Sequence, residues 1–167
     1  GKTQGLVEKM SVVMARKNIA ASDVVLLVLD ATEGATKLDA TIGGYAHDEG
    51  KSLIVVVNKW DLVEKDTHTA WQREKEIRMR MRFLSYAPLV FTSAKSGQRV
   101  FRLLEHVNKA KLARRKRIPT AEVNRFLVEK IEPRIQTVHG DRQPLMYVSQ
   151  TGLAPPTFVL FTRTRKK

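Results

Sequence analysis

Cysteine is absent from the 167 residues of this sequence, which excludes disulfide bonds and thiolate metal sites. A chain without cysteine fits a reducing compartment, so we expect a cytoplasmic protein. Histidine is scarce as well, and no H-x-x-x-H or H-E-x-x-H spacing links any two of the four residues, so no metal site is expected. These four residues are His47, His68, His106 and His139.

No apolar run approaches the length of a membrane span, and the chain does not open on a signal-peptide pattern. Acidic residues are outnumbered, because 17 Asp and Glu face 30 Lys and Arg, which gives a net charge of +13. Such an excess favours a polyanionic partner, namely RNA, DNA or an anionic membrane surface. A basic surface that serves only solubility is the alternative.

Apolar runs of strand length alternate with segments of helical periodicity up to about residue 109. Runs without alternation are typical of parallel strands buried on both faces. Thr36 with Asp39, and Thr69 with Gln72, have the spacing of capping boxes at helix starts. The sequence therefore predicts an α/β fold, a parallel sheet with helices on both faces. The expected strands are residues 24–29, 53–57 and 88–92, and the expected helices are residues 7–20, 37–49, 69–84 and 100–109.

A dense basic stretch leads from about residue 109 to Pro119 and marks an expected domain boundary. We therefore expect domains at residues 1–115 and 116–167. Basic side chains in such a stretch are candidates for contact with the RNA backbone. The candidates are Lys109, Lys111, Arg114, Arg115, Lys116 and Arg117.

The pattern after this boundary predicts a small α+β unit. Its parts are a helix over residues 120–132, a loop or weak strand at 135–140, and strands at 145–150 and 157–163 joined by a loop at 151–156. One helix on two strands is marginal alone. We therefore expect this unit to be stabilised by packing on the first domain or by further chain.

Two polar motifs directly follow the second and third expected strands. The first is N-K-x-D, and the second is S-A-K, which begins 35 positions after Asn58. Because ligands bind at the carboxyl ends of parallel strands, both motifs are placed at one candidate site. The six candidate residues are Asn58, Lys59, Asp61, Ser93, Ala94 and Lys95.

The two motifs suit the recognition of guanine. The Asp61 carboxylate can accept both N1–H and N2–H of the base in a bidentate pair, which an asparagine could not do. Asn58 would brace the loop and contact the N7 side, the Lys59 stem would lie along the ring, and the Ala94 amide would donate to O6. These are specificity contacts rather than catalytic ones. The plain alternative is an Asx turn after a strand, which the second motif makes less favoured.

The opening Gly1-Lys2-Thr3 looks like the end of a phosphate-binding P-loop, but its context does not fit. A P-loop must be followed by a switch segment and D-x-x-G before N-K-x-D, and only one helix, one strand and another helix fit before Asn58. Asp30 to Gly34 is D-x-x-x-G, one residue too long. We expect the opening residues to lie in a loop, and the phosphate, magnesium and switch parts to lie upstream.

Several stretches together resemble bacterial tandem GTPases of the Der (EngA) family. They are VLDATEG at 28–34, GYAH at 44–47, VVNKWDLV at 56–63 and TSAKSG at 92–97, then IPT at 118–120, NRFL at 124–127 and PPTFV at 155–159. The resemblance covers the later part of the second GTPase domain and the start of the KH-like domain. The sequence lacks a G-x-x-G loop, the clamp by which ordinary KH domains hold single-stranded RNA.

The resemblance implies a protein that binds and hydrolyses GTP and acts in assembly of the large (50S) ribosomal subunit, with rRNA as partner. GTP or GDP would bind, and Mg²⁺ is expected only in the complete protein. We expect a monomer, no catalytic residue in this chain, and no turnover by this chain alone. A rival hypothesis is an RNA-docking or ribosome-docking module with no nucleotide function. A membrane-surface GTPase is less favoured, because no amphipathic helix has an aromatic-rich apolar face.

Overall fold

The structure, a computed structural model, describes residues 2–64, 66–131 and 145–162, and it describes side chains from residue 12 onward except that of Leu145. The chain separates into two compact units, Gly1–Lys111 and Leu112–Lys167. The expected domain limits at residues 115 and 116 stay a prediction. Each unit is described below by itself.

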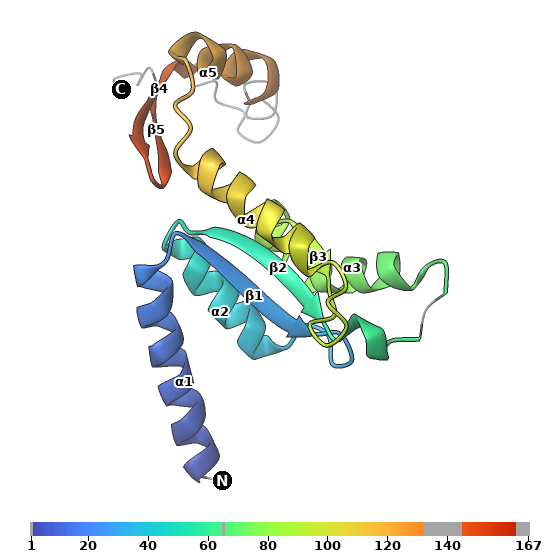
Figure 1. Cartoon of the computed structure of the whole chain (residues 1–167). Helices are drawn as coiled ribbons and strands as arrows, with labels where there is room; N and C mark the ends of the chain where they lie inside the picture. The colour runs from blue at the N-terminus through green and yellow to red at the C-terminus, as the bar shows by residue number, and fades with distance from the viewer. Residues whose placement is uncertain (1, 65, 132–144, 163–167) are drawn as a thin grey trace. The chain divides into compact units, whose positions relative to one another are not determined.

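The first unit is built on a parallel sheet of three strands in the order β1-β2-β3 (Figure 1). The strands are β1 (Val24–Asp30), β2 (Ser52–Asn58) and β3 (Leu89–Phe91). Val24 pairs with Ser52 and Asp30 with Asn58, so β1 and β2 end at the same level. The predicted α/β fold is thereby confirmed.

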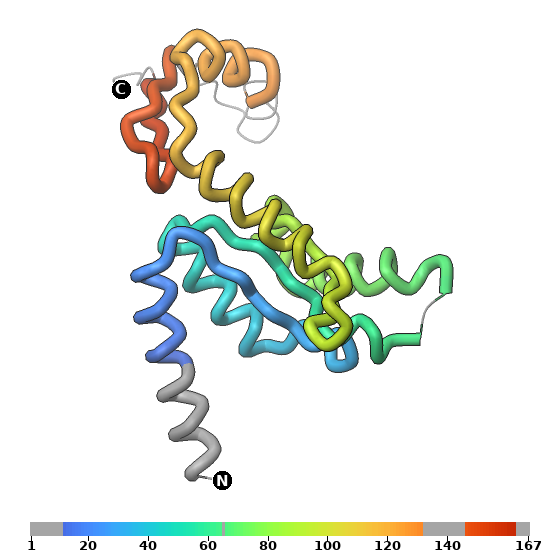
Figure 2. The backbone as a smooth tube through the Cα atoms, viewed as in Figure 1, coloured from blue at the N-terminus to red at the C-terminus, as the bar shows by residue number. Residues whose placement is uncertain are grey.

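Helices cover both faces of this sheet. The longer ones are α1 (Lys2–Ala21), α2 (Lys37–Asp48), α3 (Thr69–Arg80) and α4 (Val100–Arg114), and two short turns are η1 (Trp60–Leu62) and η2 (Arg82–Leu84). One face buries Leu29, Val55 and Val57 together with Ile19 of α1, Ala46 of α2 and Ile77 of α3. The other face packs against α4, which the tube trace in Figure 2 shows running across the sheet.

The start of α1 corrects the expectation of an opening loop, because Lys2 and Thr3 belong to the helix. The capping box of α2 is confirmed. The Thr36 hydroxyl accepts from the Asp39 amide at 3.2 Å, and the Asp39 carboxylate accepts from the Thr36 amide at 2.8 Å. This reciprocal pair satisfies two amides at the helix start that have no partner within the helix.

The capping box expected at Thr69 and Gln72 is wrong, because Thr69 is the first residue of α3, follows the N-cap residue His68 and bonds back to Asp66. Asp66 accepts from the amides of His68 and Thr69, both at 2.7 Å, and the Thr69 hydroxyl accepts from the Asp66 amide at 2.9 Å. The Thr69 hydroxyl also donates to the Asp66 carboxylate at 2.8 Å, and this bond, followed by those from the His68 and Thr69 amides, lowers the pKa of Asp66. The helix also ends at Arg80 rather than near residue 84.

Strand β1 differs from its prediction in burial. Leu27 and Leu29 are buried, but Leu26 is 40% and Val28 is 56% exposed on the opposite face. The reason is the position of α4, whose Leu103, Val107 and Ala110 pack against Ile54 and Val56 of β2 and Val90 of β3. Strand β1 is therefore buried on one face only.

The second unit contains a helix and an antiparallel hairpin. Helix α5 (Thr120–Phe126) continues into the π-helical turn η3 (Leu127–Ile131), and β4 (Leu145–Leu153) pairs with β5 (Pro156–Thr162). The expected loop at 151–156 is wrong, since the strands extend to a two-residue turn. The segment 135–140 and the expected strand end at Arg163 lie outside the described residues.

Helix α5, through a side chain, and the segment before it, through its backbone, are hydrogen-bonded to β4. The Asn124 carboxamide donates to the Val148 carbonyl and accepts from its amide, both at 2.9 Å. Buried Gln150 accepts from the Ile118 amide at 2.8 Å and donates to the Lys116 carbonyl at 3.2 Å. These contacts fix the helix on one side of the hairpin.

Between α5 and the hairpin lies a largely apolar cavity of about 460 Å³. Phe126, 56% exposed, and Leu160, 46% exposed, belong to its lining. The described residues thus leave large apolar side chains of this unit uncovered. The expectation that the unit needs further packing stays a prediction. No helix in the described part of the chain is long and apolar enough to cross a membrane.

Candidate functional site

The loops that follow β2 and β3 are joined to each other at the carboxyl edge of the sheet. The Trp60 amide donates to the Thr92 carbonyl at 3.0 Å, and the Thr92 amide donates to the Val57 carbonyl at 2.8 Å. The buried Trp60 ring packs on Phe91 with ring centroids 4.3 Å apart. These contacts anchor both motif loops in the core.

Asn58 and Ala94, one from each motif, are in direct contact. The Ala94 amide donates to Asn58 Oδ1 at 3.0 Å. The sequence analysis predicted that this amide donates to O6 of a guanine, whereas in the structure it donates to the asparagine. With Oδ1 turned to Ala94, the Nδ2 group lies on the other side of the carboxamide.

The S-A-K loop is closed on itself around Ser93. Ser93 is fully buried, its amide donates to the Gln98 carbonyl at 3.1 Å, and its hydroxyl accepts from the Ser96 amide at 3.2 Å. Ala94 and Lys95 are exposed at the tip. Ser93 therefore serves the shape of the loop, while its two neighbours are accessible.

Asp61 and Lys59 are exposed on the loop after β2. Asp61 lies in η1, directly after the buried Trp60. Lys59 has a φ of 62°, in the left-handed region that non-glycine residues seldom adopt. The structure thus brings all six predicted residues to the two adjoining loops.

Asp30 is a residue of this edge that the sequence analysis missed. Its Oδ2 lies 2.5 Å from Lys59 Nζ, and its Oδ1 accepts from the Thr32 amide at 2.8 Å and hydroxyl at 2.7 Å. The hydrogen bond with Lys59, followed by those with Thr32, lowers the pKa of Asp30 to about 2, and the same contact raises the pKa of Lys59. The available signal was an Asp at the end of an apolar strand neighbouring N-K-x-D.

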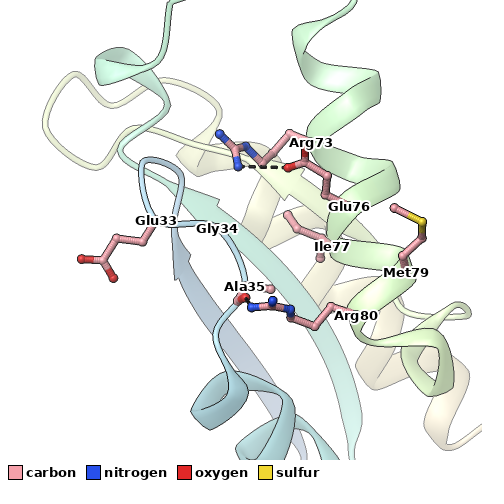
Figure 3. Close-up of a pocket in the computed structure, with 8 residues that line it drawn as sticks. All are labelled: Glu33, Gly34, Ala35, Arg73, Glu76, Ile77, Met79 and Arg80. Carbon is pink, nitrogen blue, oxygen red and sulfur yellow. Dashed lines mark hydrogen bonds and ion pairs between the residues drawn. The ribbon is translucent and has the colours of Figure 1, made fainter.

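The loop after β1 is held from the side of α3, where a cavity of about 460 Å³ opens (Figure 3). A guanidinium N–H of Arg80 donates to the Ala35 carbonyl, and Arg73 pairs with Glu76 at 3.0 Å. Figure 3 shows the Glu33 carboxylate pointing away from both arginines. Both guanidinium groups in this cavity are therefore engaged within the protein.

The basic stretch predicted for RNA contact is partly helical, because α4 extends to Arg114. Arg114 is only 6% exposed, so burial removes it from the surface that a partner can reach. The other five side chains are exposed, namely Lys109, Lys111, Arg115, Lys116 and Arg117. The candidate contact is thereby narrowed to these five.

Comparison with family models divides the chain as its fold does. Residues 11–112 match the Elongation factor Tu GTP binding domain. Residues 117–167 match the KH-domain-like region of EngA bacterial GTPase enzymes, C-terminal. The prediction that a GTPase-type domain is followed by a KH-like domain is confirmed.

Curated relatives match almost the whole chain and agree with the family models. GTPase Der from Geobacter metallireducens is 44% identical over 163 residues, which are 97% of this chain and 37% of that protein. The predicted resemblance to Der is therefore confirmed. The chain spans little more than a third of the length of this relative.

Among solved structures, Era from Aquifex aeolicus bound to GDP and AlF4⁻ matches with a TM-score of 0.50 and 27% identity. A second structure, Era in complex with MgGDPNP and nucleotides 1506–1542 of 16S ribosomal RNA, matches with the same score and identity. Each match covers 57% of this chain and 31% of the Era chain.

Proposed function

The chain belongs to the family of the Elongation factor Tu GTP binding domain, and on this premise we propose that it is the guanine-recognising part of a longer GTP-hydrolysing protein. The observation that carries the proposal is the contact between Asn58 and the Ala94 amide, which joins N-K-x-D to S-A-K at the carboxyl edge of the sheet. A ligand at such an edge is the usual arrangement in parallel α/β folds.

The proposed base contacts follow from the chemistry of the exposed groups. Asp61 accepts from N1–H and N2–H of guanine, and Asn58 Nδ2 donates to N7. The Ala94 amide donates to O6, sharing or exchanging its bond to Asn58. Lys59 packs its stem on the ring, while Ser93 shapes the second loop and Lys95 adds positive charge beside it.

We assign the phosphate chemistry to parts of the complete protein other than the described residues. Phosphoryl transfer depends on positioned phosphates and Mg²⁺, and no group of three or more His, Asp or Glu in the described part of the chain could hold a metal ion. The exposed Leu26 and Val28 support this, because another layer of the same protein would bury them. The chain alone is expected to give no magnesium-dependent release of phosphate from GTP, and measurable release would contradict this.

The proposed partner is rRNA, with a role in assembly of the large ribosomal subunit. The five exposed basic residues around the end of α4 would contact the RNA backbone. Era, whose structure matches 57% of this chain, has been seen with a fragment of 16S ribosomal RNA. The net charge of +13 favours the same class of partner.

The test of guanine recognition is Asp61→Asn in the complete protein. Loss of two charge-assisted hydrogen bonds should weaken GDP binding by about a hundredfold or more. Xanthosine diphosphate should gain relative affinity, because its 2-oxo group accepts from the amide. The readout is competition against a fluorescent nucleotide, with Glu64→Gln as a control for charge on the same loop. An unchanged preference for GDP over the xanthosine nucleotide would refute the assignment of Asp61.

The rival function is a docking module whose N-K-x-D has lost its role, and the high positive charge is what favours it. Titration of the chain with labelled GDP and labelled rRNA separates the two. RNA binding with a steep salt dependence and no response to nucleotide favours the docking module. RNA binding that changes on addition of GDP favours the nucleotide-dependent function.

A further inference from the structure

The Lys59 side chain is fixed at both of its ends. Its backbone leaves β2 in the left-handed conformation, at φ 62°, and its ammonium group meets the Asp30 carboxylate at 2.5 Å. Asp30 is the last residue of β1 and lies opposite Asn58 in the sheet register. The methylene stem of Lys59 therefore bridges the ends of two neighbouring strands.

Asp30, in turn, is held by its own loop. One carboxylate oxygen accepts two bonds from Thr32 while the other faces Lys59. The Gly34 amide donates to the Asp30 carbonyl at 2.9 Å, and the Ala31 amide donates to the Asn58 carbonyl at 2.8 Å. The ion pair thus ends on an anchor that is fixed to both strands.

The Lys59 side chain is also accessible. The side chain is 56% exposed, so a large part of its surface faces solvent although its charged end is tied down. A free lysine loses rotamer freedom when a ligand packs on its stem, which weakens binding. A tied lysine has already lost that freedom and offers an apolar surface of fixed position.

We propose that Asp30 is a positioning residue of the guanine site, which holds the Lys59 ammonium group so that the lysine stem forms a preformed surface for the flat face of the purine. The inference rests on the proposed function, because it assigns a role within the same site. Asp30 does not touch the nucleotide and acts through Lys59. Its effect therefore concerns the ring face, whereas Asp61 acts on the ring edge.

The test is Asp30→Asn in the complete protein, measured with a fluorescent guanine nucleotide. Asparagine keeps the size of the side chain and an acceptor for Thr32, but it cannot form the ion pair. We expect GDP binding to weaken about three- to tenfold, through faster release, as for a side chain that must be ordered on binding. The ratio of affinities for GDP and the xanthosine nucleotide stays unchanged, because the edge contacts are intact.

Matched controls separate positioning from general loop effects. Glu33→Gln removes a charge from the same loop that acts on Lys59 only through space and leaves the Asp30–Lys59 ion pair in place, and it should change affinity less than about twofold. The difference between Asp30→Asn and the unmodified protein should shrink between about 0.05 M and 1 M salt, because an exposed ion pair is screened. In a Lys59→Met background, which keeps an unbranched stem without the charge, Asp30→Asn should have no additional effect.

Two results would overturn the proposal. The first is an unchanged affinity and release rate for GDP in Asp30→Asn. The second is that Asp30→Asn weakens GDP binding as much in the Lys59→Met background as in the unmodified protein. Should Asp30→Asn impair folding, Lys59→Met tests the tie from its other end, with the same three- to tenfold loss expected. Unchanged affinity there contradicts the proposal. Failure of guanine recognition itself is distinguished by Asp61→Asn, whose base preference does not depend on Asp30.

Discussion

Strands β1 and β2 have similar apolar sequences but different surroundings. All five residues from 53 to 57 on β2 are at most 3% exposed, so both faces of this strand are covered. On β1, Leu27 and Leu29 are buried while Leu26 and Val28 are 40% and 56% exposed. Both segments have the continuous apolar pattern of a strand buried on both faces.

The sequence of β1 is therefore suited to surroundings larger than the described residues. Helix α4 covers β2 and β3 but leaves one face of β1 open. At the carboxyl ends the two strands are nonetheless tied together, through Asp30 and Lys59. The carboxyl edge that carries the candidate site is therefore assembled although one flank of the sheet is uncovered.

The largest expected effect compares the two faces of β1. Leu29→Ala, on the buried face, should lower the free energy of unfolding by about 3 kcal/mol, since it leaves a cavity in a packed core. Leu26→Ala, on the open face, should lower it by about 1 kcal/mol or less. Urea unfolding of the chain followed by circular dichroism measures both, and equal losses would mean that the open face is covered in solution.

A smaller effect compares β1 with β2 on one face. Val28 and Val56 are partners in the sheet register and differ in exposure, 56% against 3%. Val56→Ala should cost about 2 kcal/mol and Val28→Ala less than about 0.5 kcal/mol in this chain. In the complete protein we expect the two costs to become similar, because β1 is then covered. A Val28→Ala cost that stays small there would contradict the inferred layer over β1.

The helix that connects the two strands provides a third effect. Thr36→Ala removes the cap of α2 and should lower the free energy of unfolding by about 1 kcal/mol. Thr41 lies within the same helix and bonds only back to the Lys37 carbonyl among the contacts described. Thr41→Ala should therefore be neutral or slightly stabilising. Equal losses of unfolding free energy in the two variants, measured by urea unfolding, would show that the cap does not stabilise α2 more than Thr41 does.

The smallest effect concerns the tie between the strand ends. The pKa of Asp30 is lowered from 3.8 to about 2, so the folded chain favours the charged carboxylate. Its contribution to stability is complete above about pH 4 and is lost as the pH falls towards 2. An NMR titration of the Asp30 carboxyl should have its midpoint near 2 and should shift upward in Lys59→Met. A midpoint near 3.8 in the unmodified chain would contradict the tie.

The predictable parts of the fold were those set by local pattern. The continuous apolar runs located all three parallel strands, and Thr36 with Asp39 located the start of α2. The cap of α3 was misplaced, because Thr69 serves there as the partner of Asp66 rather than of Gln72. Spacing alone does not distinguish these two partners.

The missed parts depend on contacts distant in sequence. Whether Leu26 and Val28 are buried is decided by the path of α4, more than 70 residues later. Arg114 lies in a stretch whose basic composition predicts exposed side chains, but its own side chain is buried. The six candidate base-site residues were placed by motif, whereas Asp30 became evident only when the strand register brought it beside Lys59.

Hydrogen exchange of the complete protein with and without GDP tests whether the N-K-x-D and S-A-K loops hold the guanine base. We expect added protection in the loops at residues 58–62 and 93–98, including the Ala94 amide, because these loops are proposed to hold the base. The hairpin of β4 and β5 serves as the internal reference, because no contact with the base is proposed there. Protection by GDP that leaves both loops unchanged would contradict the claim that they form the guanine site.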